Sequence, residues 1–235
     1  PNGFYYIDYF VPEKRSSLTF RTEAELKNHW ISSSTSKIGC FTDELTHFTD
    51  SSVQRVNFWH QKLSSYGIIV FMALNIGGHP IRDYHGDSRV LSERNFRVVK
   101  SFEVTFKRAE LESRGVKFHS MFGPGAKFPN HDIFIFLTSA SKKGINVFFV
   151  PEAIAVYRGE FDQSSGQKIK ANFSMGAAIC CLYGHDFVIG YLNFVMQKIE
   201  RSEIENMEER DFSHYMLESY LNGAFDYLEA CNNQI

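Results

Sequence analysis

Two side chains capable of acid–base chemistry, His131 and Asp132, stand where an irregular loop becomes a helix. Two glycines and two prolines within residues 122–129 exclude regular structure there, and the apolar run 133–137 is typical of the first turns of a helix. Polar groups at such a junction have a fixed backbone and an open side, which is the usual setting for chemistry on a scaffold. At neutral pH an imidazole serves as a base or as a ligand.

A second candidate is the acidic pair Asp43 and Glu44, which follows the short apolar segment 38–41. Such a pair is most often a solvated turn whose carboxylates cap a neighbouring helix. Asp132 is open to the same interpretation, because an acid at the positive end of a helix dipole is favourable without any catalytic role. His131, in turn, fits an exposed cap residue. The residue types alone leave the functional and the structural interpretations open.

The elements that would position these residues alternate between strands and helices. Apolar residues recur at spacings of three and four between residues 51 and 65, which predicts a helix. The continuous apolar segment 67–74 predicts a strand buried on both faces. Together with a short strand at 38–41, these segments form a predicted βαβ unit.

The second half of the chain changes from mixed to helical. Alternating apolar residues predict a half-buried strand over 96–107, and residues 145–150 predict a strand stopped by Pro151. Beyond residue 166 the pattern is helical, with apolar stripes over 188–199 and 217–228. We therefore expect an α/β domain over residues 1–166 and a helical C-terminal extension over 167–235 that packs on it.

Composition and charge limit the classes of function that the chain can have. The chain has 235 residues, 43% of them hydrophobic, and a formal net charge of −2, which is typical of a globular protein and argues against a nucleic-acid partner. No apolar run approaches the roughly 20 residues that span a bilayer, and no signal pattern opens the chain, so the predicted location is the cytoplasm. Aromatic residues of the tail leave a peripheral contact with the inner face of a membrane as an alternative.

Three blocks follow one another in the sequence. They are the acidic turn Phe41-Thr42-Asp43-Glu44-Leu45, the loop from Gly123 to Asp132, and a strand ending in Val150-Pro151. In this order and spacing they resemble family 2 glycosyltransferases of the GT-A fold, in particular bacterial enzymes that build surface polysaccharides. The resemblance covers roughly residues 38–230. It implies a GT-A-like, Rossmann-like mixed sheet flanked by helices, with a helical tail.

Such an enzyme holds the diphosphate of a nucleotide-sugar donor against a divalent metal, and a base removes the proton of the attacking hydroxyl. The resemblance implies Asp43 and Glu44 as ligands of Mn²⁺ or Mg²⁺. It places Asp132, together with His131, in the catalytic position, with Asp132 as the base of an inverting transfer. It also implies four residues that bind the nucleotide sugar or the acceptor: Glu103, Lys107, Arg108 and Gly125.

The sequence departs from the family pattern in three places. Leu45 stands where the family usually has the acidic residue that binds the metal, and His131 stands where it has a carboxylate. Residues 1–37 are too few to supply the strands and helix that normally precede the acidic turn and grip the base and ribose. We therefore expect the N-terminal nucleotide-binding part to be incomplete.

Taken together, these features predict a glycosyltransferase. It would move a sugar from a nucleotide-sugar donor to a glycan or lipid-linked acceptor in cell-surface polysaccharide synthesis. The alternative is a non-catalytic, glycosyltransferase-like module that binds a glycan or a partner protein, and the three departures favour it.

Overall fold

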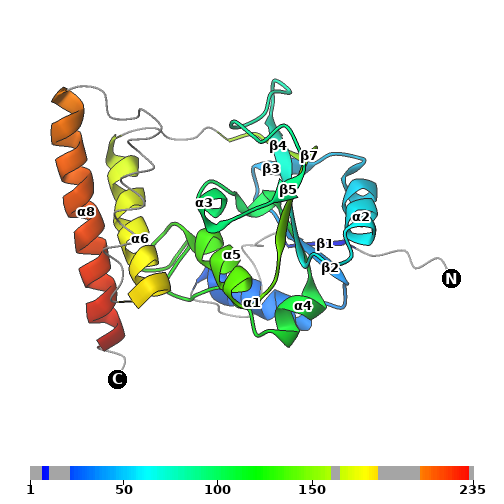
Figure 1. The fold of residues 1–235 in the computed structure, drawn as a ribbon, viewed down its shortest axis with the longest axis horizontal. Coiled ribbons are helices and arrows are strands. Elements are labelled where there is room, and N and C mark those ends of the chain that lie inside the picture. Colours follow the sequence, from blue (N-terminus) through cyan, green and yellow to red (C-terminus); the bar gives the residue numbers. More distant parts are fainter. Residues whose placement is uncertain (1–6, 11–21, 160–164, 185–206, 233–235) are drawn as a thin grey trace. The chain divides into compact units, whose positions relative to one another are not determined.

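The structure, a computed structural model, describes residues 7–10, 22–159, 165–184 and 207–232 (Figure 1). It divides into two compact units, which we describe separately. Unit 1 comprises residues 1–120 and 133–160, and unit 2 comprises residues 121–132 and 161–235. The predicted helical stripe over 188–199 lies outside the described residues.

Unit 1 is built on a mixed sheet. Among the described residues seven strands form this sheet, in the order β1-β2-β6-β4-β7-β3, with β5 pairing with β7. Their bounds are β1 Ile7–Phe10, β2 Ile38–Phe41, β3 Thr46–Phe48, β4 Ile68–Asn75, β5 Arg89–Val90, β6 Val104–Lys107 and β7 Val147–Tyr157. Because β6 is antiparallel to both β2 and β4, and β7 is parallel to β4, the strands β2, β4 and β7 all run in one direction. The predicted α/β mixed sheet is confirmed.

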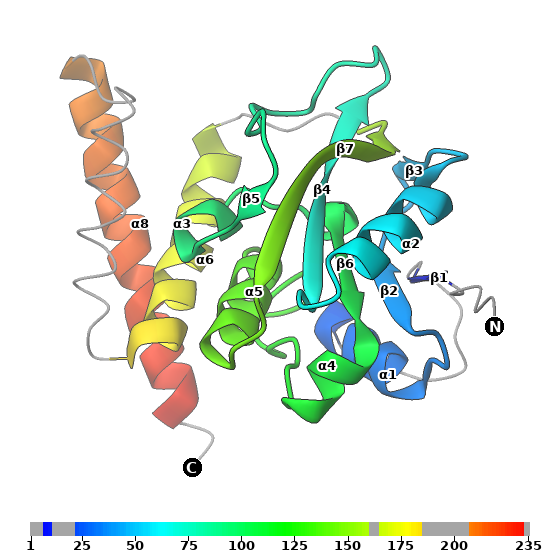
Figure 2. The ribbon, with the colours of Figure 1, turned by 45° about the vertical axis from the view of Figure 1, so that its right-hand side comes forward.

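Helices cover both faces of this sheet (Figures 1 and 2). Their bounds are α1 Glu23–Ser33, α2 Ser52–Lys62, α3 Glu93–Phe96, the 3₁₀ helix η1 Ser101–Glu103, α4 Arg108–Ser113 and α5 Asp132–Lys142. On one face Val56 of α2 packs in a core with Ile69 and Phe71 of β4. On the other face Phe136 of α5 contacts Phe106, with ring centroids 6.3 Å apart. Of the apolar residues whose spacing predicted α2, Val56 is buried, and Trp59 and Leu63 are partly buried against this core.

Two predicted strands differ from the structure. Residues 96–107 do not form one strand, because α3 and η1 occupy the first part and only β6 is extended. The strand predicted to stop at Pro151 continues through it to Tyr157 as β7. The pairing of β4 with β7 shifts register between Val70 and Met72, opposite this proline. A strand tolerates proline at such an irregularity because no ladder hydrogen bond is needed there.

Unit 2 contains helices α6 Ser165–Tyr183 and α8 Met207–Asn232. They run parallel, because the chain descends through both helices in the view of Figure 1. The hydroxyl of Ser219 donates to the carbonyl oxygen of Ile169 at 2.9 Å. A Cβ atom on Gly176 would lie 1.8 Å from the carbonyl oxygen of Tyr220, and one on Gly223 would lie 1.9 Å from that of Phe173. The two glycines thus let the helix backbones touch.

Candidate functional site

The acidic turn lies where three parallel strands end. Asp43 follows β2, Asn75 ends β4, and Tyr157 ends β7 opposite Asn75. In open α/β sheets ligands bind outside the carboxyl ends of the strands. The topology of unit 1 therefore puts Asp43 at the edge of the sheet where a ligand is expected.

The Asp43 side chain is fixed by its own turn. Its Oδ1 accepts hydrogen bonds from the backbone N–H of Leu45, at 3.0 Å, and from the hydroxyl of Thr46, at 2.7 Å. Asp43 is half-buried, whereas Glu44 is exposed. The turn is thus an Asx-type turn that holds one carboxylate rigidly and leaves its neighbour in solvent.

The end of β7 completes this turn, a contact that no local sequence pattern indicated. The backbone N–H of Arg158 donates to the carbonyl oxygen of Leu45 at 2.8 Å. Tyr157 lies close enough to Asp43 that its pKa is raised, first by burial and second by that negative charge. The guanidinium of Arg158 is exposed beside the turn. Tyr157 and Arg158 therefore belong to the candidate site.

Glu103 lies near the same edge, but its carboxylate is inside the protein. Glu103 is 0% exposed. Its carboxylate accepts hydrogen bonds from the guanidinium of Arg82 at 2.9 Å, from the hydroxyl of Tyr84, and from the backbone N–H of Lys100 at 2.8 Å. Burial, followed by the Glu103 charge, raises the pKa of Tyr84 above its ordinary value. In the structure Glu103 anchors the loop that follows β4.

Lys107 and Arg108 lie at the opposite edge of the sheet. Lys107 pairs with Ile38 at the start of β2, whereas Asp43 comes after the end of that strand. The ammonium of Lys107 donates to the carbonyl of Ser64, and the Nε of Arg108 donates to the carbonyl of Ser36 at 3.0 Å. The structure does not bring this basic pair to the acidic turn, and its predicted contact with donor or acceptor stays a prediction.

The loop before Asp132 belongs to unit 2. Gly123 and Gly125 adopt φ angles of +97° and +78°, which favour glycine. Phe122 and Phe128 stack with ring centroids 5.1 Å apart, and Phe128 also contacts Phe173 of α6 at 5.7 Å. The loop is therefore shaped by its glycines and held by aromatic packing against α6.

Gly123 leaves space in this loop for the side chain of Asp132. A Cβ atom on Gly123 would lie 3.2 Å from both Cβ and Cγ of Asp132, so a side chain at residue 123 would crowd the carboxylate. The preceding residue, His131, has a φ of +68°, the one positive value among the described non-glycine residues. Its Nε2 lies 2.8 Å from the carbonyl oxygen of Ala171. Since a carbonyl only accepts, Nε2 carries the proton and His131 is fastened to α6.

The acidic turn alone provides too few ligands for a metal ion, so a bound diphosphate would have to provide the others. Within the described residues no group of three or more His, Cys, Asp or Glu side chains could hold a metal ion. The turn offers the carboxylates of Asp43 and Glu44, and Mg²⁺ is usually bound through one or two carboxylates together with substrate phosphates. The donor set is therefore suited to a metal that arrives with a diphosphate.

Among the helices in the described part of the chain, none is long and apolar enough to cross a membrane.

Comparisons with known proteins find similarity in structure but not in sequence. No protein-family model and no curated protein matches the chain. Solved structures of S. aureus TarS 1–349 do match. The first has a TM-score of 0.53 at 10% identity and covers 86% of this chain and 60% of TarS 1–349.

Two further matches are TarS 1–349 with bound nucleotides. The complex with UDP-GlcNAc has a TM-score of 0.55 at 9% identity and covers 89% of this chain and 64% of that one. The complex with UDP has a TM-score of 0.52 at 10% identity, and the match covers 91% of this chain and 72% of that one. The chain thus spans less than two thirds of the first two. At such identities the likeness concerns the fold alone, which is a glycosyltransferase-like α/β fold.

Proposed function

We propose that this protein is a glycosyltransferase that moves a sugar from a nucleotide-sugar donor to a hydroxyl group of an acceptor. The observation that carries the proposal is the rigid carboxylate of Asp43 at the carboxyl edge of β2, β4 and β7. The fold around it is similar to that of TarS, which has been solved with UDP-GlcNAc and with UDP. A uridine diphosphate sugar is therefore the first donor class to test.

On the donor side, Asp43 and Glu44 would hold Mn²⁺ or Mg²⁺ together with the diphosphate, and such a cation would supply positive charge against the negative charge that builds up on the leaving group. Arg158 is exposed beside the turn and supplies a planar guanidinium, a group that matches phosphate oxygens. Tyr157 keeps its phenolic proton, because burial and Asp43 both raise its pKa, and it can donate that proton in a hydrogen bond.

On the acceptor side, Asp132 is the base. The acceptor oxygen attacks the anomeric carbon, the bond from that carbon to the diphosphate breaks, and the hydroxyl proton passes to the Asp132 carboxylate. Attack from the face opposite the leaving group inverts the configuration. The space beside Gly123 and the His131–Ala171 hydrogen bond support this role, because both fix where the carboxylate lies.

The acceptor and the setting follow from the family resemblance. We propose a glycan or a lipid-linked acceptor in cell-surface polysaccharide synthesis, on the cytoplasmic side, with peripheral contact with the membrane as an accompanying proposal. Gly125 shapes the loop before Asp132 with its positive φ and is the proposed point of close approach to a ligand.

A second candidate function is a non-catalytic module that binds a glycan or a partner protein. Leu45 favours it, because an apolar side chain that is 44% exposed occupies the turn where the family has its metal-binding acid. The carbonyl oxygen of Leu45 also accepts a hydrogen bond from the backbone N–H of Arg158, so the turn is ordered without any cation.

The two functions are separated by measuring UDP binding and sugar transfer on the full-length protein. Calorimetry with UDP, with and without Mn²⁺, is compared for wild type, Asp43→Asn and Asp132→Asn. Under the proposal UDP binding needs the metal, is lost in Asp43→Asn and is kept in Asp132→Asn. Release of UDP from UDP-sugars in the presence of glycan acceptors falls about 10²- to 10⁴-fold in Asp132→Asn.

Each result decides between the candidates. A wild-type protein that binds no UDP in either condition contradicts a transferase that uses a uridine diphosphate sugar. Glycan binding that is equal in wild type and Asp132→Asn, with no UDP release from either, establishes the binding module instead.

A further inference from the structure

Three of the four cysteines gather at one end of the helix pair of unit 2. Cys180 and Cys181 lie in the last turn of α6, and Cys231 lies in the last turn of α8. All three are thiols and form no disulfide in the structure. Because the two helices run parallel, their last turns lie at the same end of the pair (Figure 1).

The contacts between α6 and α8 follow a fixed register. Ser219 donates its hydroxyl hydrogen bond to Ile169, 50 residues earlier in the chain. The close approach of Gly223 to the carbonyl oxygen of Phe173 has the same separation in sequence. Residues spaced by four lie on one face of a helix. The facing sides of the pair therefore contain every fourth residue, counted from Ile169 on α6 and from Ser219 on α8.

This register brings Cys181 opposite Cys231. Each of them comes three steps of four residues after Ile169 or Ser219, respectively. Tyr227 lies one turn before Cys231 on α8, and its hydroxyl forms side-chain hydrogen bonds with the thiols of both Cys181 and Cys231. One phenol group therefore joins the two sulfur atoms, which come from different helices.

The surroundings of this pair favour thiol chemistry. Burial raises the pKa of Tyr227, and its contacts with Cys181 and Cys231 raise it further, so the phenol keeps its proton. A phenolic O–H that donates to a sulfur stabilises the thiolate, and the thiolate is the form that attacks a disulfide. Cys181 and Cys231 are both half-buried and thus keep some contact with solvent.

Cys180 is set apart from this pair although it is adjacent to Cys181. It is buried, and burial, followed by the charges of Cys181 and Cys231, raises its pKa to about 11. Consecutive Cα atoms are about 3.8 Å apart, whereas a disulfide usually needs about 4.4 Å or more. Cys180 therefore stays a protonated thiol and does not bridge to its neighbour within the helix.

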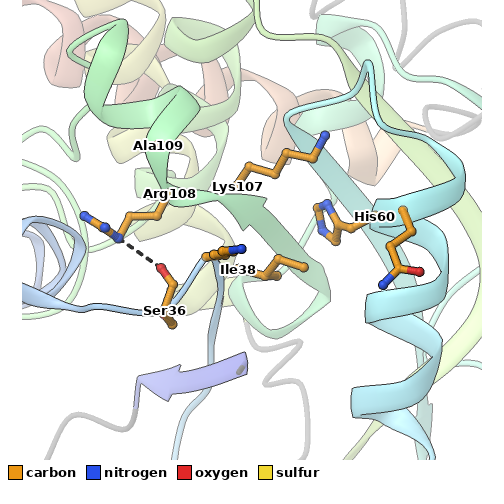
Figure 3. A pocket seen from close by; sticks show the side chains of 8 residues that line it. Ser36, Ile38, His60, Lys107, Arg108 and Ala109 are labelled. Atoms are coloured by element: carbon orange, nitrogen blue, oxygen red, sulfur yellow. Dashed lines mark hydrogen bonds between the residues drawn. The ribbon is translucent and has the colours of Figure 1, made fainter. Parts of the chain in front are cut away.

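The remaining thiol, Cys40, lies within β2 in unit 1. It is 1% exposed, and burial raises its pKa well above the ordinary value. The pocket at the start of the same strand, with a volume of about 340 Å³, is lined by Ile38 and His60 but not by Cys40 (Figure 3). A reagent in that pocket therefore does not touch the Cys40 thiol.

We propose that Cys181 and Cys231 are a site of reversible oxidation, at which exchange with a small disulfide such as glutathione disulfide creates a cross-link between α6 and α8. The thiolate of one cysteine attacks the reagent, forms a mixed disulfide and releases one glutathione thiolate. The other cysteine attacks the protein sulfur of that mixed disulfide, forms the Cys181–Cys231 bond and releases the second.

Overall the two protein thiols lose two electrons and two protons, and one glutathione disulfide becomes two molecules of glutathione. In a reducing compartment such disulfides are usually transient and sense the redox state. The inference does not depend on the proposed transferase.

The cross-link would act on the loop before Asp132. The ring of Tyr227 contacts those of Phe122 and Phe128, with centroids 5.8 Å and 6.1 Å apart. Phe128 also contacts Phe173 of α6. The loop is thus held by the two helices that the disulfide joins, so oxidation is expected to slow the amide hydrogen exchange of residues 122–128.

The test follows the full-length protein through glutathione buffers with a rising share of glutathione disulfide, by mass spectrometry of acid-quenched samples. Wild type is expected to lose two thiols together and to yield one cross-linked peptide pair that contains Cys181 and Cys231. Cys181→Ser and Cys231→Ser lose the cross-link. Each accumulates the mixed disulfide with glutathione about tenfold above wild type, because no second thiol resolves it.

The other two cysteines supply matched controls. Cys180→Ser and Cys40→Ser are expected to keep the cross-link at the wild-type share of glutathione disulfide. The slower exchange of residues 122–128 should appear in oxidised wild type and oxidised Cys180→Ser and be absent from Cys231→Ser. A mixed disulfide that accumulates in wild type without a cross-link, or a cross-link that persists in Cys231→Ser, overturns the inference. Unchanged exchange in fully cross-linked wild type overturns the effect on the loop.

Discussion

The Nε2 atom of His131 lies 2.8 Å from the carbonyl oxygen of Ala171, so a residue next to the proposed base is fastened to helix α6. His131 also has a φ of +68°, a conformation that histidine and asparagine adopt more readily than most residues. His131 is therefore placed to act as a positioning residue for Asp132.

Replacing His131 separates its backbone role from its hydrogen bond. His131→Ala removes the donor and is expected to lower the free energy of unfolding by about 1 kcal/mol. It should also lower kcat more than it changes KM, because Asp132 loses its support. His131→Asn tolerates the left-handed backbone and should be the milder variant in urea unfolding and in turnover. Equal damage in both variants contradicts the assignment.

Gly123 is expected to be essential for the placement of Asp132. A Cβ atom there would lie 3.2 Å from the Asp132 side chain, so Gly123→Ala requires the carboxylate to shift by a few tenths of an ångström. Because a misplacement of 1 Å costs about 10²-fold, we expect kcat to fall about tenfold, while UDP binding persists. Gly78→Ala is the matched control, because Gly78 has a similar φ of +78° and nothing within 4 Å of its would-be Cβ. Steady-state kinetics of the two variants should differ sharply; equal kcat values would remove Gly123 from the site.

The parallel helix pair of unit 2 should not tolerate side chains at its contact. Gly176→Ala places a methyl group against the carbonyl of Tyr220, and we expect a loss of about 1–3 kcal/mol in thermal or urea unfolding. That loss appears although alanine is the better helix former by about 1 kcal/mol. Asn222→Ala, on the exposed side of α8, is the control and should be neutral or slightly stabilising. Identical behaviour of the two variants would mean that the helices are not in contact at Gly176.

The buried carboxylate of Glu103 should be costly to neutralise. Glu103→Gln leaves the guanidinium of Arg82 without its charge partner, and breaking a buried pair in this way costs about 3 kcal/mol or more. Glu112→Gln, which removes a partly exposed pair with Arg108, should cost less than about 1 kcal/mol. Hydrogen exchange should also accelerate in the loop that carries Arg82 and Tyr84. An equal loss of unfolding free energy in the two variants would show that the buried network stabilises the protein no more than the partly exposed pair does.

His60 gives unit 1 a pH dependence of defined sign. Its pKa is about 3 in the folded protein and about 6.5 in an unfolded chain, so below pH 6.5 the unfolded state binds the additional proton. Stability is therefore complete above pH 6.5 and falls as the pH drops towards 3, by ~2 kcal/mol at pH 5. Urea unfolding of wild type and His60→Gln at pH 7.5 and pH 5 should show a smaller loss in the variant. Parallel losses would assign the pH dependence to other groups.

The sequence predicted the elements whose signal is local. The strand over 38–41 and the start of α5 at Asp132 match the structure, and helix α2 and strand β4 lie within a few residues of their predicted bounds. These predictions succeeded because apolar periodicity and capping residues report on a few neighbouring positions. The continuation of β7 beyond Pro151 escaped them, since a proline is harmless there only because the partner strand shifts register.

The chemistry-bearing residue types were visible in the sequence, but their surroundings were decided by the tertiary structure. Glu103 is enclosed by Arg82 and Tyr84 from a distant loop, and Lys107 lies at the far edge of the sheet because β6 runs antiparallel to β2. His131 meets Ala171, which lies 40 residues further along the chain. A hydrogen bond over that separation depends on how helices and strands pack, and no local pattern encodes it. The sequence by itself determined which groups could react, and the packing determined which of them stand together.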